Sequence, residues 1–457
     1  MLSALMSMTN ALSTDRGESH KALQGVTPAT EAVAEILRPT LEVVFADPAV
    51  EIEFWDWSSV GYCDGPGRIR VNSIDALRRI LWSPDELGLA RAYVTGELDV
   101  TGSIVEILPT IRADGSLSRW RRAAAAPGML AALRRLGGVG HAPPVPAEEL
   151  LPRGRRHSLR RDRQAIRHHY DVGIEFYELV LGPAMTYSCA RFAEPTTTLF
   201  EAQAAKHDLI CRKLGLGEAG FVEASHGRRT RLLDVGCGWG SMALHAASNY
   251  DVEVVGVTIS EEQAAYARRR VKQAGLDDRV EIRIQDYREV TDGPFDAVSS
   301  IGMSEPVGSE LLDTYFERLL SLVRPGGRVL NHAISKVGGS RLGRRSFVYR
   351  YVFPDGELID VGESLLAMER AGFEIRDVEN LREHYATTLR RWVANLEARW
   401  DDAVSLVGER RARVWLLYMS GSINGFDDGG LQLHQVLGVR NASDGTSGVP
   451  PTRCGWA

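Results

Sequence analysis

A chain of 457 residues is longer than one ordinary hydrophobic core, so its length predicts two domains. Its composition, 44% hydrophobic and 25% charged, is that of a folded globular protein, and its net charge of −6 gives no overall attraction to nucleic acid. Five cysteines without a metal-binding spacing, and no apolar run of about 18 residues or basic leader, favour a soluble or peripheral cytoplasmic protein without a metal site.

The N-terminal part of the chain predicts an unstructured terminus and then a small α+β domain. Residues 1–30 are rich in Ser, Thr and Gly, and we expect them to be disordered. The segments 41–45, 51–55 and 68–71 are typical of short strands. We expect this domain to span residues 31–112. It contains no acid/base constellation, so packing or lipid contact is its favoured role.

Arginines crowd residues 113–163 and predict a basic linker. The proline-rich stretch 141–146 would break any helix. Two interpretations stay open: a solvated linker, or attraction to anionic lipid headgroups worth about 1 kcal/mol for each basic residue near the surface. No base-reading motif accompanies these arginines, so nucleic acid is not an expected partner.

From residue 164 onward, strand and helix patterns alternate in the manner of βαβ units. The predicted strands are 231–235, 253–258, 280–285, 295–301, 327–333 and 373–379. Amphipathic helices are predicted at 261–275 and 311–322. We therefore expect a doubly wound, Rossmann-like parallel sheet over 164–438, followed by a loose tail over 439–457.

The stretch 232–240 predicts a strand, a tight glycine turn and the start of a helix. Asp234 lies near the end of the strand, and Gly236, Gly238 and Gly240 alternate with larger residues. Glycines permit positive φ and close backbone approach, while the helix N-terminus offers free N–H groups and about half a positive charge. Such turns bind nucleotides or nucleosides. Alone the motif is weak, because many α/β proteins turn in this way without a ligand.

Polar groups follow the next two predicted strands. The first ends at Thr258-Ile259, with Gln263 one helical turn on, where a dinucleotide enzyme usually carries an acid for the ribose diol. Hydroxyl and amide groups can bind a ribose or an amino-acid tail without a phosphate. The second ends at Asp286-Tyr287, where a carboxylate suits the adenine amine and an aromatic ring can stack on the base. The set favours adenosine without pyrophosphate, although Thr258 could merely end its strand and Asp286 could merely cap the next segment.

Further polar groups lie where sites in α/β proteins form. Glu305 comes just past the carboxyl end of a predicted strand, and His332 and Tyr385 could converge with it. The adjacent pair His168 and His169 is too close for a helical metal site, so we interpret it as pocket or structural. A lone buried glutamate is more often an ion-pair partner than a catalyst. A catalytic role therefore depends on whether these side chains lie close together in the fold.

Taken in order, these residues resemble the cyclopropane-fatty-acyl-phospholipid synthase family of S-adenosylmethionine-dependent enzymes. The matching segments are His169-Tyr170-Asp171 with Gly173, Tyr187-Ser188-Cys189, Asp234 to Gly240, Gly256 to Ser260 with Gln263, Gly302-Met303 with Glu305, and His384-Tyr385 with Leu389 and Trp392. The ordered set covers about 164–436 and is far more specific than the glycine turn. Residues 92–99 resemble part of the family's smaller, lipid-associated domain.

The resemblance implies a class I methyltransferase fold that binds S-adenosylmethionine, with Tyr187 and Ser188 joining the cofactor residues named above. It also implies methyl transfer from the sulfonium to a double bond in unsaturated acyl chains of membrane phospholipids. Alkene π electrons attack the methyl carbon, so no protein nucleophile is needed. The carbocation that follows must be kept from water, and an aromatic face such as that of Tyr385 would stabilise it by about 0.5–2 kcal/mol.

In this family a bound bicarbonate is the base that removes the proton. The matching positions here are Cys189, Glu305, His332, Tyr385 and the backbone of Ile334. A neutral pocket holding a small anion can deprotonate a cation without leaving a buried side-chain charge unpaired. Peripheral contact with the membrane surface is implied as well, and a homodimer is left open.

Departures from the family pattern leave the product open. Ser304 and Pro306 flank Glu305 where relatives usually have an aromatic residue and a histidine, and Phe192 stands where relatives often have adjacent aromatics. A changed cation lifetime would decide between a cyclopropane ring and a 10-methylene branch, the precursor of the 10-methyl chains made by some actinobacterial members. The competing hypotheses are a conventional methyltransferase acting on a small polar acceptor and a non-catalytic lipid-binding protein.

Overall fold

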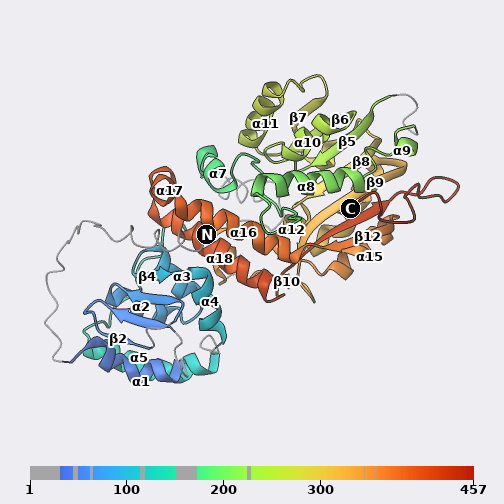
Figure 1. Ribbon diagram of the computed structural model, residues 1–457. Helices are drawn as coiled ribbons and strands as arrows, with labels where there is room; N and C mark the ends of the chain where they lie inside the picture. The colour runs from blue at the N-terminus through green and yellow to red at the C-terminus, as the bar shows by residue number, and fades with distance from the viewer. Residues whose placement is uncertain are drawn as a thin grey trace, which may run out of the picture.

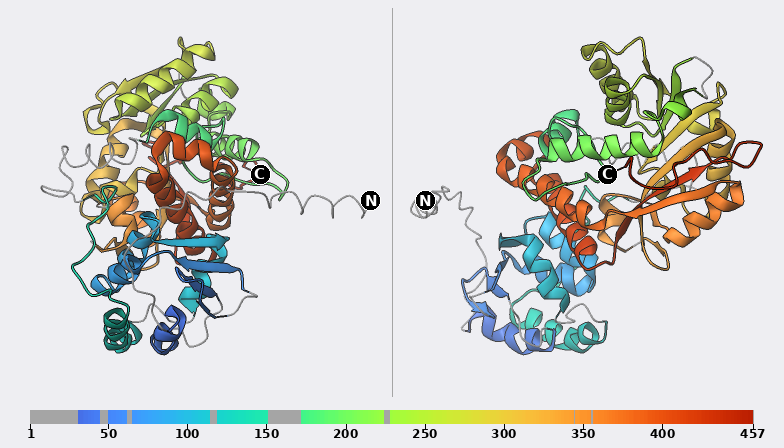
Figure 2. Two further views of the ribbon diagram at one scale, coloured as in Figure 1. Left: turned by 90° about the vertical axis from the view of Figure 1, so that its left-hand side faces the viewer. Right: turned by 45° about the vertical axis from the view of Figure 1, so that its right-hand side comes forward.

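The computed structural model describes residues 31–44, 50–61, 65–113, 119–150, 172–223, 228–343, 345–354 and 356–456. The expected disordered terminus 1–30 and the histidines at 168 and 169 lie outside these ranges. The described chain forms a small N-terminal domain and a larger α/β domain, with a group of long helices between them (Figures 1 and 2). No helix among the described residues is long and apolar enough to span a membrane.

The small domain is built on a four-stranded sheet in the order β2-β1-β3-β4. Its strands are β1 (Glu51–Phe54), β2 (Ser59–Val60), β3 (Gly67–Val71) and β4 (Leu98–Gly102). Its helices are α1 (Val33–Val44), α2 (Ile74–Trp82), α3 (Glu86–Val94), α4 (Ile104–Ala113) and α5 (Arg119–Arg135). The strands predicted at 51–55 and 68–71 are confirmed as β1 and β3, which pair in parallel.

Two predictions about this region are wrong. The segment 41–45 was expected to be a strand, but residues up to 44 belong to α1, because Val33, Leu37 and Leu41 recur at helical spacing on one buried face. Residues 119–135 were expected within a linker, but they form α5, which lies along α1 and buries Leu133 in the core of the small domain (Figure 1).

The large domain contains a seven-stranded sheet in the order β12-β13-β9-β8-β5-β6-β7. Its strands are β5 (Thr230–Val235), β6 (Val252–Thr258), β7 (Val280–Ile284), β8 (Phe295–Ile301), β9 (Val323–Ser335), β12 (Glu374–Asn380) and β13 (Gln432–Val439). The order runs outward from β5 in both directions, so the doubly wound, Rossmann-like fold is confirmed. Strand β13 was not predicted, and it pairs antiparallel with both β9 and β12.

Helices cover both faces of this sheet because adjacent strand residues point to opposite sides. Leu232 packs in one core with α8 (Leu199–Lys213), α10 (Ser241–Asn249) and α11 (Glu261–Gln273), whereas Leu233 packs in another with α13 (Leu312–Leu322) and α15 (Val361–Ala371). The shorter elements are α9 (Ala219–Glu223), η1 (Tyr287–Glu289), α12 (Ser304–Val307), η2 (Ser309–Leu311), β10 (Ser340–Arg341), α14 (Phe347–Tyr351) and β11 (Glu357–Leu358).

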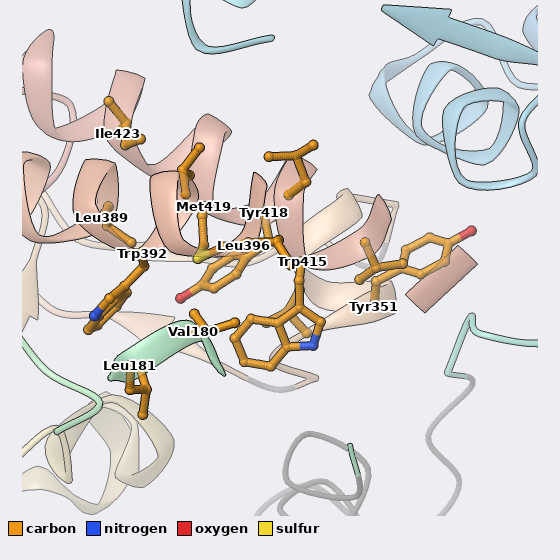
Figure 3. Packing of buried hydrophobic residues seen from close by; sticks show 14 of the residues in the cluster. Val180, Leu181, Tyr351, Leu389, Trp392, Leu396, Trp415, Tyr418, Met419 and Ile423 are labelled. Atoms are coloured by element: carbon orange, nitrogen blue, oxygen red, sulfur yellow. The ribbon is translucent and has the colours of Figure 1, made fainter. Parts of the chain in front are cut away.

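An aromatic-rich helical layer joins the two domains. It consists of α7 (Ile174–Leu181), α16 (Arg382–Ala398), α17 (Trp400–Val407) and α18 (Glu409–Asp427). Figure 3 shows Trp392, Trp415 and Met419 packed beside Val180 in its core. Fully burying one large apolar side chain contributes about 1.5–3 kcal/mol to the free energy of folding, so this layer stabilises the contact between the two domains. It reaches the small domain through Arg413, which donates hydrogen bonds to Asp99 at 3.2 and 3.3 Å.

The segment predicted to be a loose tail packs against the sheet instead. Trp456 is buried in the core beside α8 and α10, and Arg328 donates a hydrogen bond to the carbonyl of Gly448 at 2.8 Å. Arg453 also forms an ion pair with the buried Asp377. The abundance of Ser, Gly and Pro suggested a loose end, but one terminal tryptophan and these polar contacts hold the segment in place.

Candidate active site

A cavity of about 490 Å³ lies at the carboxyl ends of the parallel strands, where ligands bind in open α/β sheets. One part is lined by the glycine turn and the polar strand ends, and another part by apolar side chains. The predicted site residues that line it are Tyr187, Ser188, Asp234, Gly236, Gly238, Thr258, Ile259, Gln263, Asp286, Tyr287, Glu305, His332, Ile334 and Tyr385. The structure therefore brings together groups that are far apart in the sequence.

The glycine turn adopts the positive φ angles that its sequence predicts. Gly236 has φ of +73°, and a Cβ atom there would lie 2.3 Å from the sulfur of Met303. Gly240 has φ of +81°, and a Cβ there would lie 2.9 Å from the Cβ of Ala267. Gly240 is not among the residues that line the cavity, so its role in this structure is close packing of α10 against α11.

Asp234 is buried at the end of β5 and keeps one oxygen unsatisfied. Ser299 donates a hydrogen bond to its Oδ1 at 2.7 Å, whereas Oδ2 has no partner among the described residues. Burial raises the pKa of this carboxyl to about 6. Buried polar atoms almost always have partners, so Oδ2 fits a donor group on a ligand, such as an ammonium.

The polar ends of β6 and β7 are held by local hydrogen bonds. Thr258 donates to the side-chain oxygen of Gln263 at 2.9 Å, which fixes the glutamine at the cavity wall. Asp286 accepts a hydrogen bond from the backbone of Arg288 at 3.0 Å and forms an ion pair with its guanidinium. The capping role left open for Asp286 is therefore confirmed, and the same residue lies on the cavity wall. Tyr287 packs edge-on against Tyr315.

The segment before α8 contributes two of its three predicted residues to the cavity. The ring of Tyr187 stacks on Trp392 at 5.4 Å, and burial raises its pKa well above the usual value. Ser188 also lines the cavity. Cys189 does not: it is fully buried behind the wall, where its sulfur donates to the carbonyl of Ala190 at 3.1 Å. Burial raises the pKa of this thiol, so it is a neutral packing group in this structure.

Glu305 and His332 line the cavity, and each has one buried side-chain atom without a hydrogen-bond partner among the described residues. The backbone N–H of Ile334 donates to Glu305 Oε1 at 2.8 Å, while Oε2 lacks a partner in the part of the chain that the structure describes. His332 Nδ1 lies 3.3 Å from the amide nitrogen of Gln435, and within the same ranges Nε2 has no partner. Because an amide N–H donates to Nδ1, the ring proton lies on Nε2.

Burial shifts the titration of both groups. It lowers the pKa of His332 well below the usual range, so the imidazole is neutral, and it raises the pKa of Glu305, which shifts that carboxyl toward its protonated form. A neutral carboxylic acid and a neutral imidazole N–H are hydrogen-bond donors, and together they suit a small anion. Tyr385 flanks them with its ring 4.7 Å from that of Phe426. Ile334 was expected to contact the anion through its backbone; in the structure its backbone N–H holds Glu305.

The rest of the cavity is lined mainly by apolar side chains, with Glu357, Tyr418 and Ser422 among them, and suits a hydrocarbon chain. The apolar side chains come from α12, η2, α14, β11, α16, α18, β13 and the neighbouring loops, namely Val307, Leu311, Leu342, Val348, Val352, Phe353, Pro354, Leu358, Leu389, Phe426, Leu431 and Leu433. Pro306, one of the departures from the family pattern, also lines the cavity, whereas Ser304 is buried beside it.

Lys206 and His207, also on the cavity wall, were missed by the sequence analysis. Helix α8 places Lys206 in line with Ala202 and Leu209 on its buried face. A lysine on the apolar stripe of an amphipathic helix is unusual, because lysine is rarely fully buried without a partner. That pattern is the signal that could have identified the residue.

Comparison with known proteins agrees with this geometry. Residues 157–436 match the family described as mycolic acid cyclopropane synthetase. The chain is 41% identical to "Probable fatty acid methyltransferase Rv3720" of Mycobacterium tuberculosis, over 92% of this chain and 97% of the relative. It is 38% identical to the cyclopropane-fatty-acyl-phospholipid synthase of Escherichia coli K12, over 61% of this chain and 68% of the relative.

Solved structures give the same result. The mycolic acid cyclopropane synthase CmaA1 complexed with SAH and CTAB is 31% identical, with a TM-score of 0.55, covering 60% of this chain and 97% of that one. The resemblance stated from the sequence motifs is thus confirmed. The chain belongs to the mycolic acid cyclopropane synthetase family and is an S-adenosylmethionine-dependent methyltransferase of the cyclopropane-synthase type.

Proposed function

We propose that the protein alkylates the double bond of unsaturated acyl chains in membrane phospholipids, and that bicarbonate held by Glu305 and His332 is the base. The observation that carries this proposal is the pair of unsatisfied buried atoms, Glu305 Oε2 and His332 Nε2, on a cavity that also has a glycine turn and apolar walls. The residues present fit both groups that the family implies.

Asp234, Ser188 and Gln263 would hold the amino-acid and ribose parts of S-adenosylmethionine, and Asp286 with Tyr287 would hold the adenine. When bound, this cofactor supplies an electrophilic methyl group to the alkene. Gly236 and Gly238 leave room for it, since both lack a side chain and line the cavity.

Glu305 and His332 would hold bicarbonate by donating hydrogen bonds from Oε2 and Nε2. When bound, bicarbonate supplies an acceptor for the proton lost from the carbocation. The ring of Tyr385 would stabilise the cation, and the surrounding apolar side chains would exclude water. Support comes from burial, which keeps His332 neutral and raises the pKa of Glu305, because an anion is opposed less by a carboxyl whose charged form is disfavoured.

Phospholipid is the proposed substrate because the apolar part of the cavity suits an acyl chain rather than a polar acceptor. Peripheral contact with a membrane surface belongs to the same proposal, since the acyl chain must be drawn from a bilayer. Pro306 beside Glu305 is where we place the choice between a ring and a methylene branch.

The experiment is incubation of the protein with S-adenosylmethionine, bicarbonate and vesicles of oleoyl phospholipid, followed by mass spectrometry and proton NMR of the lipids. A mass gain of one methylene unit with upfield ring protons identifies a cyclopropane, and the same gain with vinylidene protons identifies a methylene branch. Unchanged lipid, with methylation of a small polar acceptor instead, would favour the conventional methyltransferase.

A further inference from the structure

Two residues of α8 hold the segment 186–188 at the cavity wall. The side-chain amide of Gln203 donates to the carbonyl of Ser188 at 2.8 Å, and the ammonium of Lys206 donates to the Ser188 hydroxyl oxygen at 3.0 Å. Both side chains are buried, and they lie on the same face of the helix because they are three residues apart. Neither was assigned a role above.

Lys206 is a buried cation without an ion-pair partner at contact distance among the described residues. Its Nζ lies 2.9 Å from Nε2 of His207, and burial lowers the pKa of His207 well below the usual range, so that imidazole is neutral. Burial lowers the pKa of Lys206 to about 7; the acidic side chains near it are Cys189, whose thiol is neutral, and Asp234, whose charged form opposes the shift. His332 is a further titratable group within its electrostatic range.

Burying an ammonium without an anion is costly, and the lowered pKa of Lys206 reflects that cost; an anion bound nearby would favour the charged form again. The Ser188 hydroxyl offers a route to one. Because Lys206 donates to the hydroxyl oxygen, the proton of Ser188 is free to point into the cavity that Ser188 lines. Asp234 lines the same cavity, and its Oδ2 has no hydrogen-bond partner within the described ranges.

We propose that Lys206 is the positioning residue for the α-carboxylate of the cofactor, acting through the hydroxyl of Ser188. The zwitterionic amino-acid group of the cofactor then meets two complementary charges: its carboxylate lies toward Ser188 and Lys206, and its ammonium lies toward Asp234. Gln203 keeps the segment in place so that the hydroxyl is aimed correctly. This inference rests on the cofactor of the proposed function, and on neither its lipid substrate nor bicarbonate.

The test compares two ligands that differ only in the amino-acid group. S-adenosylhomocysteine carries the α-carboxylate and the α-amino group, whereas 5′-methylthioadenosine has the same adenosyl thioether without them. We expect Lys206→Met to weaken binding of S-adenosylhomocysteine about tenfold or more, as loss of a charge-assisted contact does, and to leave 5′-methylthioadenosine within about twofold. Isothermal titration calorimetry of the full chain measures both.

Lys213→Met is the matched control, because Lys213 is a second buried lysine of α8 but is ion-paired to Asp377 at 2.9 Å and lies away from the cavity. This variant should lose stability while keeping the ratio of the two affinities. Equal weakening of both ligands by Lys206→Met, or no weakening of either, would overturn the proposal. Wild-type protein that fails to bind S-adenosylhomocysteine would overturn the cofactor assignment itself.

If Lys206→Met does not fold, the wild-type protein carries the test. A carboxylate brought near a lysine with a pKa of about 7 raises that pKa, so binding takes up protons. Calorimetry at about pH 7.5 in buffers of different ionisation enthalpy should show proton uptake with S-adenosylhomocysteine and none with 5′-methylthioadenosine. Equal uptake with both ligands contradicts the proposal.

Discussion

Glu305 accepts a hydrogen bond from the backbone N–H of Ile334 at 2.8 Å, so one carboxyl oxygen is anchored and the other faces the cavity. The N–H donor belongs to β9 and the carboxyl belongs to α12, two elements that are separate in the sequence. A rigid sheet strand therefore sets the direction of the group that the proposed reaction uses. This arrangement lets a neutral Glu305 act as a donor to a small anion.

Replacing Glu305 by glutamine should separate binding from turnover. Glutamine keeps the size of the side chain and can still donate a hydrogen bond, through its amide N–H, but it cannot exchange a proton with a bound base. We expect Glu305→Gln to lower kcat by about a hundredfold, a typical loss for acid–base function, and to leave the affinity for S-adenosylhomocysteine within about twofold. Full turnover in this variant would remove Glu305 from the mechanism.

Asp234→Asn should make the free protein more stable at neutral pH. The pKa of Asp234 is raised from about 3.9 in the unfolded chain to about 6 by burial, so below the lower value the carboxyl is protonated in both states. The free energy of unfolding then falls as the pH rises through the pKa of the folded protein, and it remains lower above that pKa. Asparagine removes this penalty, which is about 1–3 kcal/mol.

Urea unfolding of both proteins at several pH values measures the effect. The free energy of unfolding should be higher for the variant than for the wild type above about pH 6. This difference should fall toward zero near pH 4. The same variant should bind S-adenosylhomocysteine more weakly, because an amide cannot pair with the ammonium. A variant that is less stable than the wild type at pH 8 would contradict the burial account of Asp234.

Val348→Phe should narrow the apolar part of the cavity without touching the cofactor end. Val348 lies on α14 and lines the cavity. We expect KM for oleoyl phospholipid to rise about tenfold, because a larger side chain in a packed wall costs about 1–3 kcal/mol, and shorter acyl chains to be favoured. Val337→Phe is the control, since Val337 is 74% exposed. Equal KM values in the two variants would argue against an acyl chain at this wall.

Pro306→His should change which lipid product forms and should leave KM for the lipid nearly unchanged. Pro306 lines the cavity beside Glu305, so a histidine there places a new donor near the cation and restores the usual family residue. We expect the fraction of cyclopropane product to rise while KM for the lipid stays within about twofold. Proton NMR of the product lipids measures the ratio. An unchanged ratio would place product choice elsewhere.

Local sequence patterns were sufficient for β1, β3 and all strands of the large sheet except β13, and for most of the cofactor end of the cavity. The glycine turn, Thr258 with Gln263, and Asp286 each lie within a few residues of a strand end, so their placement follows from the βαβ pattern. Strand β13 was missed because Gln432–Val439 is buried on both faces of the sheet, and such a strand does not show the alternation of a half-exposed one.

The predictions that differ from the structure share one physical cause, which is tertiary contacts that a local sequence pattern does not show. The helix α1 overrides the local strand preference of Val43 and Val44 because its buried stripe packs on the small domain. Cys189 and Gly240 belong to matching motifs but lie behind the cavity wall, which motif position alone does not show. Lys206 was missed because its significance depends on Ser188, which lies 18 residues away and joins it only in the fold.

The most direct test of the central claim is the bicarbonate dependence of lipid product formation. Initial rates should be measured with S-adenosylmethionine and oleoyl phospholipid vesicles in buffer freed of carbon dioxide, and again as bicarbonate is added back. The proposed site predicts a rate that falls at least about tenfold on depletion and returns saturably with bicarbonate in the wild type, but not in Glu305→Gln. A rate that is the same with and without bicarbonate, in protein that forms the lipid product, would contradict it.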